Sequence, residues 1–153
     1  MEWDNATCSI ALALDVVGTR SALLAMREAH LGTRRFDDFV RRIGQGEPAV
    51  AARLKELVAA GLLERVPYQE PGQRTRHEYQ LTPKGRELLP VLTALRQWGD
   101  AWQVGPEGPS LLATHRGCGA DVHTVLRCAA GHDVGDGELE MQRAPSFGTT
   151  SGK

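Results

Sequence analysis

Residues 46–65, GEPAVAARLKELVAAGLLER, combine a helical pattern with the signal that ends it. Val50, Leu54 and Leu57 recur at the spacing that places side chains on one face of an α-helix. The glycine at the start can serve as N-cap, and the nearby proline is tolerated because an N–H there would lack a helical partner. Gly61 is typical of the position just after a helix, and the next residues favour a strand. The stretch therefore predicts a helix that passes directly into a strand.

The segments before and after residues 46–65 also have helix and strand patterns, and together they give an order of secondary-structure elements. Three helices are expected before the strands: one capped by Thr7 and running through roughly Arg27, one beginning at Phe36, and the helix just described. Two strand-like runs, LLERVPYQ and RTRHEYQL, follow and are joined by EPGQ, which is typical turn chemistry. Thr82-Pro83 then begins a helix expected to last to about Trp102. This order predicts a mainly helical α+β fold, the winged helix-turn-helix.

Composition shifts divide the chain into three parts. GPEGP at 105–109 is a linker, so we expect one winged-helix domain over residues 1–104. Residues 105–142 are expected to form a small β-hairpin module, and residues 143–153 a disordered tail because they are small and polar.

The overall composition narrows the functional class. The chain has 153 residues and a formal net charge of −1, but residues 34–86 hold eleven basic and seven acidic side chains. Positive charge is thus concentrated in the middle of the chain, where nucleic acid could bind. No signal sequence, apolar membrane span or disulfide framework is apparent, which favours a cytoplasmic protein without a membrane partner. No catalytic motif appears, so we do not expect an enzyme.

Three stretches together resemble the HxlR-type family of bacterial transcriptional regulators. They are DVVGTRSALLAMREAHLGTRRFDDFVRRI, RLKELVAAGLLERVPYQE and RHEYQLTPKGRELLPVLTALRQWGD. The resemblance implies a homodimer that binds operator DNA and joins through its N- and C-terminal helices. Two positions depart from the family pattern: Ser21 stands where the family has a tryptophan, and Glu47-Pro48-Ala49 replaces a helix start that is usually basic or polar.

The candidate DNA contacts therefore lie mostly outside the base-reading helix. That helix offers few side chains that read base edges, so phosphate contacts from surrounding arginines are expected to supply most of the affinity. The arginines beside the hairpin tip could enter a minor groove. Alternatively, several of these cations are ordinary surface charges paired with neighbouring acids. The candidates are Arg34, Arg35, Arg41, Arg42, Glu47, Ala49, Ala52, Arg53, Lys55, Arg74 and Arg76.

The first and last helices carry more apolar side chains than a domain of this size needs. A dimer interface accounts for them, and two-fold symmetry would set two reading helices roughly 34 Å apart on a pseudo-palindromic operator. A small-molecule effector could bind beside the two tryptophans. The candidate interface residues are Ile10, Leu14, Val17, Leu88, Val91, Leu92, Leu95, Trp98 and Trp102.

Two further sites involve sulfur. Cys8 lies at a helix N-terminus, which stabilises a thiolate, and some members of the resembled family sense oxidants near this position; a small buried apolar role is the alternative. His115, Cys118, Cys128 and His132 have spacings that could close a tetrahedral zinc site; the alternative is a degenerate, metal-free knuckle, which the altered second pair favours.

The sequence thus predicts a dimeric DNA-binding regulator controlled by a small molecule, an oxidant or a metal. The alternative is a winged-helix protein that has lost DNA binding and acts as a ligand- or protein-binding module, which Glu47-Pro48 favours.

Overall fold

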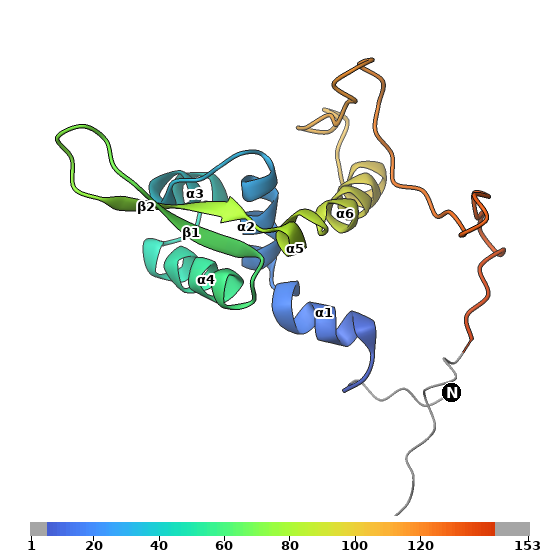
Figure 1. The fold of residues 1–153 in the computed structure, drawn as a ribbon. Coiled ribbons are helices and arrows are strands. Elements are labelled where there is room, and N and C mark those ends of the chain that lie inside the picture. The colour runs from blue at the N-terminus through green and yellow to red at the C-terminus, as the bar shows by residue number, and fades with distance from the viewer. Residues whose placement is uncertain (1–5, 143–153) are drawn as a thin grey trace, which may run out of the picture.

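The computed structural model describes residues 6–142, and Figure 1 shows the order of the elements. The expected disordered tail at 143–153 lies outside the described residues. Six helices and one two-stranded antiparallel sheet make up the described fold: α1 (Ser9–Val17), α2 (Arg20–His30), α3 (Phe36–Ile43), α4 (Glu47–Ala59), β1 (Leu63–Tyr68), β2 (Arg76–Leu81), α5 (Pro83–Arg86) and α6 (Leu89–Trp102). This is the predicted winged helix-turn-helix, with the β1–β2 hairpin as its wing.

The hydrophobic core lies where α2, α3 and α4 meet the hairpin. Phe39 of α3 is fully buried and meets the ring of Tyr79 edge-on, with 5.9 Å between the ring centres. Leu63 pairs with Leu81 at one end of the hairpin, and Tyr68 pairs with Arg76 at the other. The other large side chains that are almost fully buried are Met26, Val50, Leu54, Leu57 and Leu63. These contacts fix the wing relative to α3 and α4.

The helix-to-strand segment forms as expected. Gly46 is the N-cap of α4, and Gly61 follows its C-cap with a φ of +71°, a left-handed conformation that favours glycine. The Leu62 N–H then donates to the Leu57 carbonyl at 3.0 Å, which closes the end of the helix. Leu62 and Leu63 are both buried, so the chain enters β1 already packed on the core.

The expected first helix is two helices. It was predicted to run unbroken from Thr7 to about Arg27, but it stops at Gly18, and α1 and α2 meet at 78°. Thr19 begins α2 by accepting a hydrogen bond from the Ala22 N–H at 3.2 Å. Cys8, rather than Thr7, is the N-cap of α1, and its side chain makes no capping hydrogen bond.

The expected last helix is also divided, into α5 and α6. Thr82 caps α5: its hydroxyl accepts from the Gly85 N–H at 3.0 Å and donates to the Gly61 carbonyl at 2.6 Å. A Cβ on Gly85 would lie 2.1 Å from the Leu62 carbonyl oxygen, so only glycine fits against the α4–β1 junction. α6 begins afresh at Leu89, with Pro90 in its first turn, where a missing N–H costs nothing.

Residues 105–142 follow α6 as a C-terminal arm. The arm contains two isolated antiparallel bridges, Thr114–Asp121 and Arg127–Asp133, instead of the regular β-hairpin expected from the sequence. Figure 1 shows the arm running away from the helical body after α6. Over residues 6–142 no single helix is long and apolar enough to cross a membrane; the bent pair α1 and α2 meets that test only when taken together.

Candidate nucleic-acid interface

The outer face of α4 is short of side chains that read bases. Its inner residues Val50, Leu54 and Leu57 are buried in the core, whereas Glu47, Ala49 and Ala52 are exposed. Alanine methyl groups let a helix approach another surface closely, but they offer no hydrogen bonds to base edges. Lys55 is exposed on the same helix and forms no ion pair among residues 6–142.

Arg53, a candidate phosphate contact, is held by its own domain. Its Nε donates to the Ser21 hydroxyl at 3.0 Å, and its guanidinium pairs with Glu56. The side chain is only 23% exposed. Ser21 stands where the resembled family has a tryptophan, so here a hydrogen bond between α2 and α4 occupies that position. Sequence analysis identified the substitution without identifying its partner.

Arg34 and Arg35 lie just before α3 and join it to the wing. Arg34 pairs with Glu78 of β2 at 3.2 Å, and Arg35 pairs with Glu70 at 2.6 Å. The Arg35 guanidinium also lies 5.2 Å from the centre of the Tyr68 ring, a cation–π contact. The hydrogen bond to Glu70 raises the pKa of Arg35, which therefore remains charged. Both arginines keep more than half of their side-chain surface exposed.

An open hollow of about 240 Å³ lies in front of these two arginines. Asp38 and Arg42 of α3 contribute to its wall. Asp38 pairs with Arg41, another candidate contact, whose side chain is 69% exposed. The hollow is therefore lined by both signs of charge, and its cations already have acidic neighbours.

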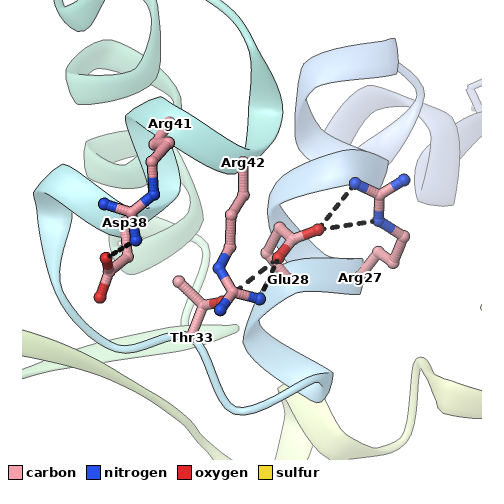
Figure 2. Close-up of polar contacts among 6 residues, drawn as sticks. All are labelled: Arg27, Glu28, Thr33, Asp38, Arg41 and Arg42. Atoms are coloured by element: carbon pink, nitrogen blue, oxygen red, sulfur yellow. Dashed lines mark hydrogen bonds and ion pairs between the residues drawn. The ribbon is translucent and has the colours of Figure 1, made fainter.

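Glu28 is a buried acid beside the candidate interface that sequence analysis missed. Its carboxylate is buried between α2 and α3 and accepts hydrogen bonds from the Arg27 guanidinium at 2.7 Å and the Thr33 hydroxyl at 3.2 Å. Arg42 of α3 approaches the same carboxylate at 3.7 Å (Figure 2). Arg42 thus balances a buried charge as well as facing solvent. An acid flanked by the buried Ala25, Met26 and Ala29 was the available signal.

Two arginines beside the wing tip have no acidic partner within the described residues. Arg74 and Arg76 line a small recess with Tyr68, Glu70 and Gln73, and neither forms an ion pair within the described part of the chain. Gly72 has a φ of +73°, which turns the loop, and the Gln69 side-chain amide donates to the Gln73 carbonyl at 3.0 Å. Figure 1 shows the hairpin loop projecting beyond α3 and α4, at the opposite end of the molecule from α6.

The predicted dimer residues divide into two groups. Ile10, Leu14, Val91, Leu95, Trp98 and Trp102 are all exposed, Trp102 by 73%. Val17 was wrongly included, because it is 7% exposed and belongs to the core. Leu88 and Leu92 are partly buried and pack against that core, so they are mainly structural.

The four predicted zinc ligands remain two separate pairs. The His115 Nδ1 lies 3.3 Å from the Cys118 Sγ, and the Cys128 and His132 backbones close the second turn. Backbone N–H groups of His132 and Ala130 lower the pKa of the exposed Cys128 thiol. In residues 6–142 no three His, Cys, Asp or Glu side chains gather closely enough to hold a metal ion, so the expected site is not assembled. Cys8 is half-buried at the start of α1.

Residues 16–106, which span α2 to α6, match the family described as HxlR-like helix-turn-helix. The chain belongs to the HxlR family. It is 39% identical to an uncharacterized HTH-type transcriptional regulator of Mycobacterium tuberculosis, Rv3095, over 91% of this chain and 87% of the relative. The HxlR-family chain described here is therefore a transcriptional regulator with a helix-turn-helix domain, as its sequence predicted, and its class is non-enzymatic.

Two solved structures place this HxlR-family fold in context. The crystal structure of PA1607 is 34% identical and superposes with a TM-score of 0.80, covering 91% of this chain and 96% of that one. The redox regulator HypR in its oxidized form is 27% identical, with a TM-score of 0.58, and covers 64% of this chain but 100% of its own. The match to PA1607 must include part of the segment after Trp102, whereas the match to HypR covers a smaller share of this chain.

Proposed function

We propose that this HxlR-family regulator acts in the cytoplasm as a homodimer on a pseudo-palindromic duplex operator. One observation carries the proposal: charge and apolar surface are segregated. Of the eighteen exposed large apolar side chains in residues 6–142, all but Leu31 lie on α1, on α6 or after Trp102. Lys55, Arg74 and Arg76 form no ion pair within residues 6–142 and belong to α4 and the wing, although α2, α5 and the arm also carry cations without an ion pair.

In the proposed complex α4 enters the major groove and the wing follows the backbone beside it. The exposed Glu47, Ala49 and Ala52 give α4 little direct base readout, so sequence preference comes mainly from groove shape and deformability. Phosphate contacts from Lys55, Arg74 and Arg76 then supply most of the affinity. The paired arginines Arg34, Arg35, Arg41 and Arg42 contribute further once phosphates compete with their acidic partners.

The apolar faces of α1 and α6 form the proposed two-fold contact. Ile10, Leu14, Leu95, Trp98 and Trp102 would leave water when two copies meet, which is the driving force for association. An effector bound beside the tryptophans, or oxidation at Cys8 on α1, would alter the angle between the two winged-helix units. Such a change moves the two α4 helices out of register with successive major grooves.

Selection from a random duplex pool, with the purified full chain, tests this function. We expect an inverted-repeat consensus whose half-site centres lie roughly 34 Å apart, and affinity that falls steeply as salt rises. Failure to bind any duplex at low salt would instead favour a module that binds ligands or proteins, the reading that Glu47 at the start of α4 motivates.

A further inference from the structure

The C-terminal arm carries apolar side chains that its own chain does not cover. Leu112, Val125, Leu126 and Met141 are each at least 60% exposed. Val104, Leu111, Val122 and Leu139 add further exposed surface along the same segment. Residues 105–142 therefore behave as an extended arm without a core of their own, and apolar surface of this extent is characteristic of a segment that packs on a partner.

The arm is held in shape by local bonds and by one bond to α6. The two isolated bridges and the Arg127–Asp133 ion pair at 2.8 Å all join residues within the arm. The Thr124 N–H donates to the Gln97 side-chain oxygen at 2.6 Å, which is the one hydrogen bond from the arm to a helix in residues 6–142. This bond attaches the arm to α6 at Gln97.

The charge of the arm identifies the class of partner. Residues 105–142 contain two basic and six acidic side chains, and every acid from Asp133 to Glu140 lies beyond its last basic residue, Arg127. A segment with this charge is repelled by phosphates, so DNA is excluded as the surface that covers it. The faces of α1 and α6 carry few charges: α1 has the exposed Asp15, and Arg96 and Asp100 of α6 pair with each other at 2.6 Å.

The relatives show that the arm is a folded part of some HxlR-family structures. The superposition on PA1607 covers 91% of this chain with a TM-score of 0.80, which requires that part of the arm superposes too, because α6 ends at Trp102 of 153 residues. HypR is covered over its whole length by 64% of this chain. The arm makes few contacts with the helices of its own chain. We therefore expect it to hold its conformation by packing on another molecule.

We infer that the arm of each chain packs on a second copy of this chain, against the partner's α1 and α6. This inference rests on the homodimer proposed above. Stable interfaces use about 20 to 30 residues on each side. The exposed faces of α1 and α6 supply nine large apolar side chains, and the segment after Trp102 supplies eight more. The arm therefore completes an interface that the two short helices begin.

Photo-crosslinking in mixed dimers locates the arm. Unlabelled full-length chains carrying a benzophenone side chain in place of Leu126 are exchanged with an excess of ¹⁵N-labelled chains that lack it. Crosslinked peptides are then sequenced by mass spectrometry. We expect residue 126 to be joined to ¹⁵N-labelled peptides from residues 9–17 or 89–102.

The outcomes separate this inference from the proposed dimer. Suppose that sedimentation gives the mass of two chains, so that the dimer stands. Crosslinks that join residue 126 only to unlabelled peptides would then overturn the arm inference. Crosslinks to labelled peptides of α3, α4 or the hairpin would overturn it as well. A mass of one chain at micromolar concentration would overturn both.

A pair of substitutions gives an independent measure. Leu126→Asp places a charge on a side chain that is 60% exposed in the single chain, so it leaves the fold intact. Because a buried leucine is lost twice in each dimer, we expect the dimer dissociation constant to rise at least tenfold. Leu31→Asp is the matched control: Leu31 is 48% exposed and lies at the end of α2. Equal dissociation constants for the two variants would overturn the inference.

Discussion

Glu28 lies 4% exposed between α2 and α3, where its carboxylate accepts from Arg27 and from the Thr33 hydroxyl. A buried carboxylate is stable only while these donors compensate for the water it has lost. Arg42 brings a second positive charge to it from α3. This one side chain therefore connects α2 to α3.

We expect Glu28→Gln to lower the free energy of unfolding by about 1–3 kcal/mol, because the amide accepts fewer charge-assisted hydrogen bonds. Urea unfolding at a fixed protein concentration measures the change. Glu64→Gln, at an exposed position of β1, is the control and should change stability by about 0.5 kcal/mol or less. Equal effects of the two substitutions would contradict the role assigned to Glu28.

His30 makes stability depend on pH near neutrality. Its Nε2 lies 3.1 Å from the Gly85 carbonyl oxygen, to which it donates, and burial lowers the pKa of His30 although this hydrogen bond offsets part of the shift. In the unfolded chain the His30 imidazole becomes protonated near its ordinary pKa of about 6.5. In the folded chain the same imidazole becomes protonated only at lower pH, so acid favours the unfolded state. Stability is thus complete above about pH 6.5 and declines as the pH falls below it.

Urea midpoints measured at several pH values between about 7.5 and 5.5 should therefore decrease with falling pH. His30→Gln should reduce that decrease, whereas His123→Gln, on the exposed arm, should retain it. Identical pH dependence in the wild-type chain and His30→Gln would rule out this linkage.

At the scale of elements, α5 depends on a close contact with the α4–β1 junction. A methyl group on Gly85 would lie 2.1 Å from the Leu62 backbone oxygen, which cannot move without displacing buried Leu62 and Leu63. We expect Gly85→Ala to cost about 3 kcal/mol of stability, measured by thermal or urea unfolding. Gly99→Ala on α6, where no atom lies within 4 Å of the added methyl, should leave stability unchanged or slightly higher. A fully stable Gly85→Ala chain would show that this contact can relax.

In the proposed complex the wing contributes Arg74 and Arg76, which form no ion pair in residues 6–142. Arg76→Ala should weaken binding to all duplex sequences alike and reduce the salt slope of log K by about 1, because one phosphate contact is lost. Arg116→Ala, on the acidic arm, removes the same charge far along the chain from the wing and is the control. Fluorescence anisotropy over a salt series distinguishes them, and an unchanged slope for Arg76→Ala would remove the wing from the proposed interface.

The elements that the sequence predicted correctly are those with local start and stop signals. α4 has its glycine cap, its apolar spacing and the left-handed Gly61, all within a few residues. The breaks at Gly18 and between α5 and α6 were missed because apolar residues keep helical spacing across them. Thr19 was the available signal, since it caps a new helix.

The sequence identified the cationic residues of the candidate interface, but it did not identify the side chains that pair with them. Arginines could be identified as cations from the sequence, yet the acids that pair with Arg34 and Arg42 are distant in sequence and meet them only in the fold. The Ser21–Arg53 hydrogen bond likewise joins α2 to α4. Long-range pairing of this kind depends on tertiary structure, which periodicity and spacing do not encode.

The whole molecule has two ends of different chemistry, and the apolar end should govern association. Trp98 is 57% exposed on α6 and contributes nothing to the core, so Trp98→Lys should leave helical circular dichroism intact. We expect analytical ultracentrifugation at micromolar concentration to give two chains for the wild type and one for Trp98→Lys, because a buried unpaired ammonium opposes the contact. Leu31→Lys should remain dimeric. A dimeric Trp98→Lys would move the two-fold contact away from α6.

The concentration of exposed apolar side chains on α1, α6 and the arm also bears on the lifetime of a newly made chain. A chain that has not yet formed the proposed dimer presents the kind of surface that chaperones bind and proteases degrade. Pairing would protect it, so the cellular amount of regulator should rise more steeply than its rate of synthesis. A gene expressed only weakly would then yield almost no lasting protein, which gives the cell a threshold without any additional control circuit.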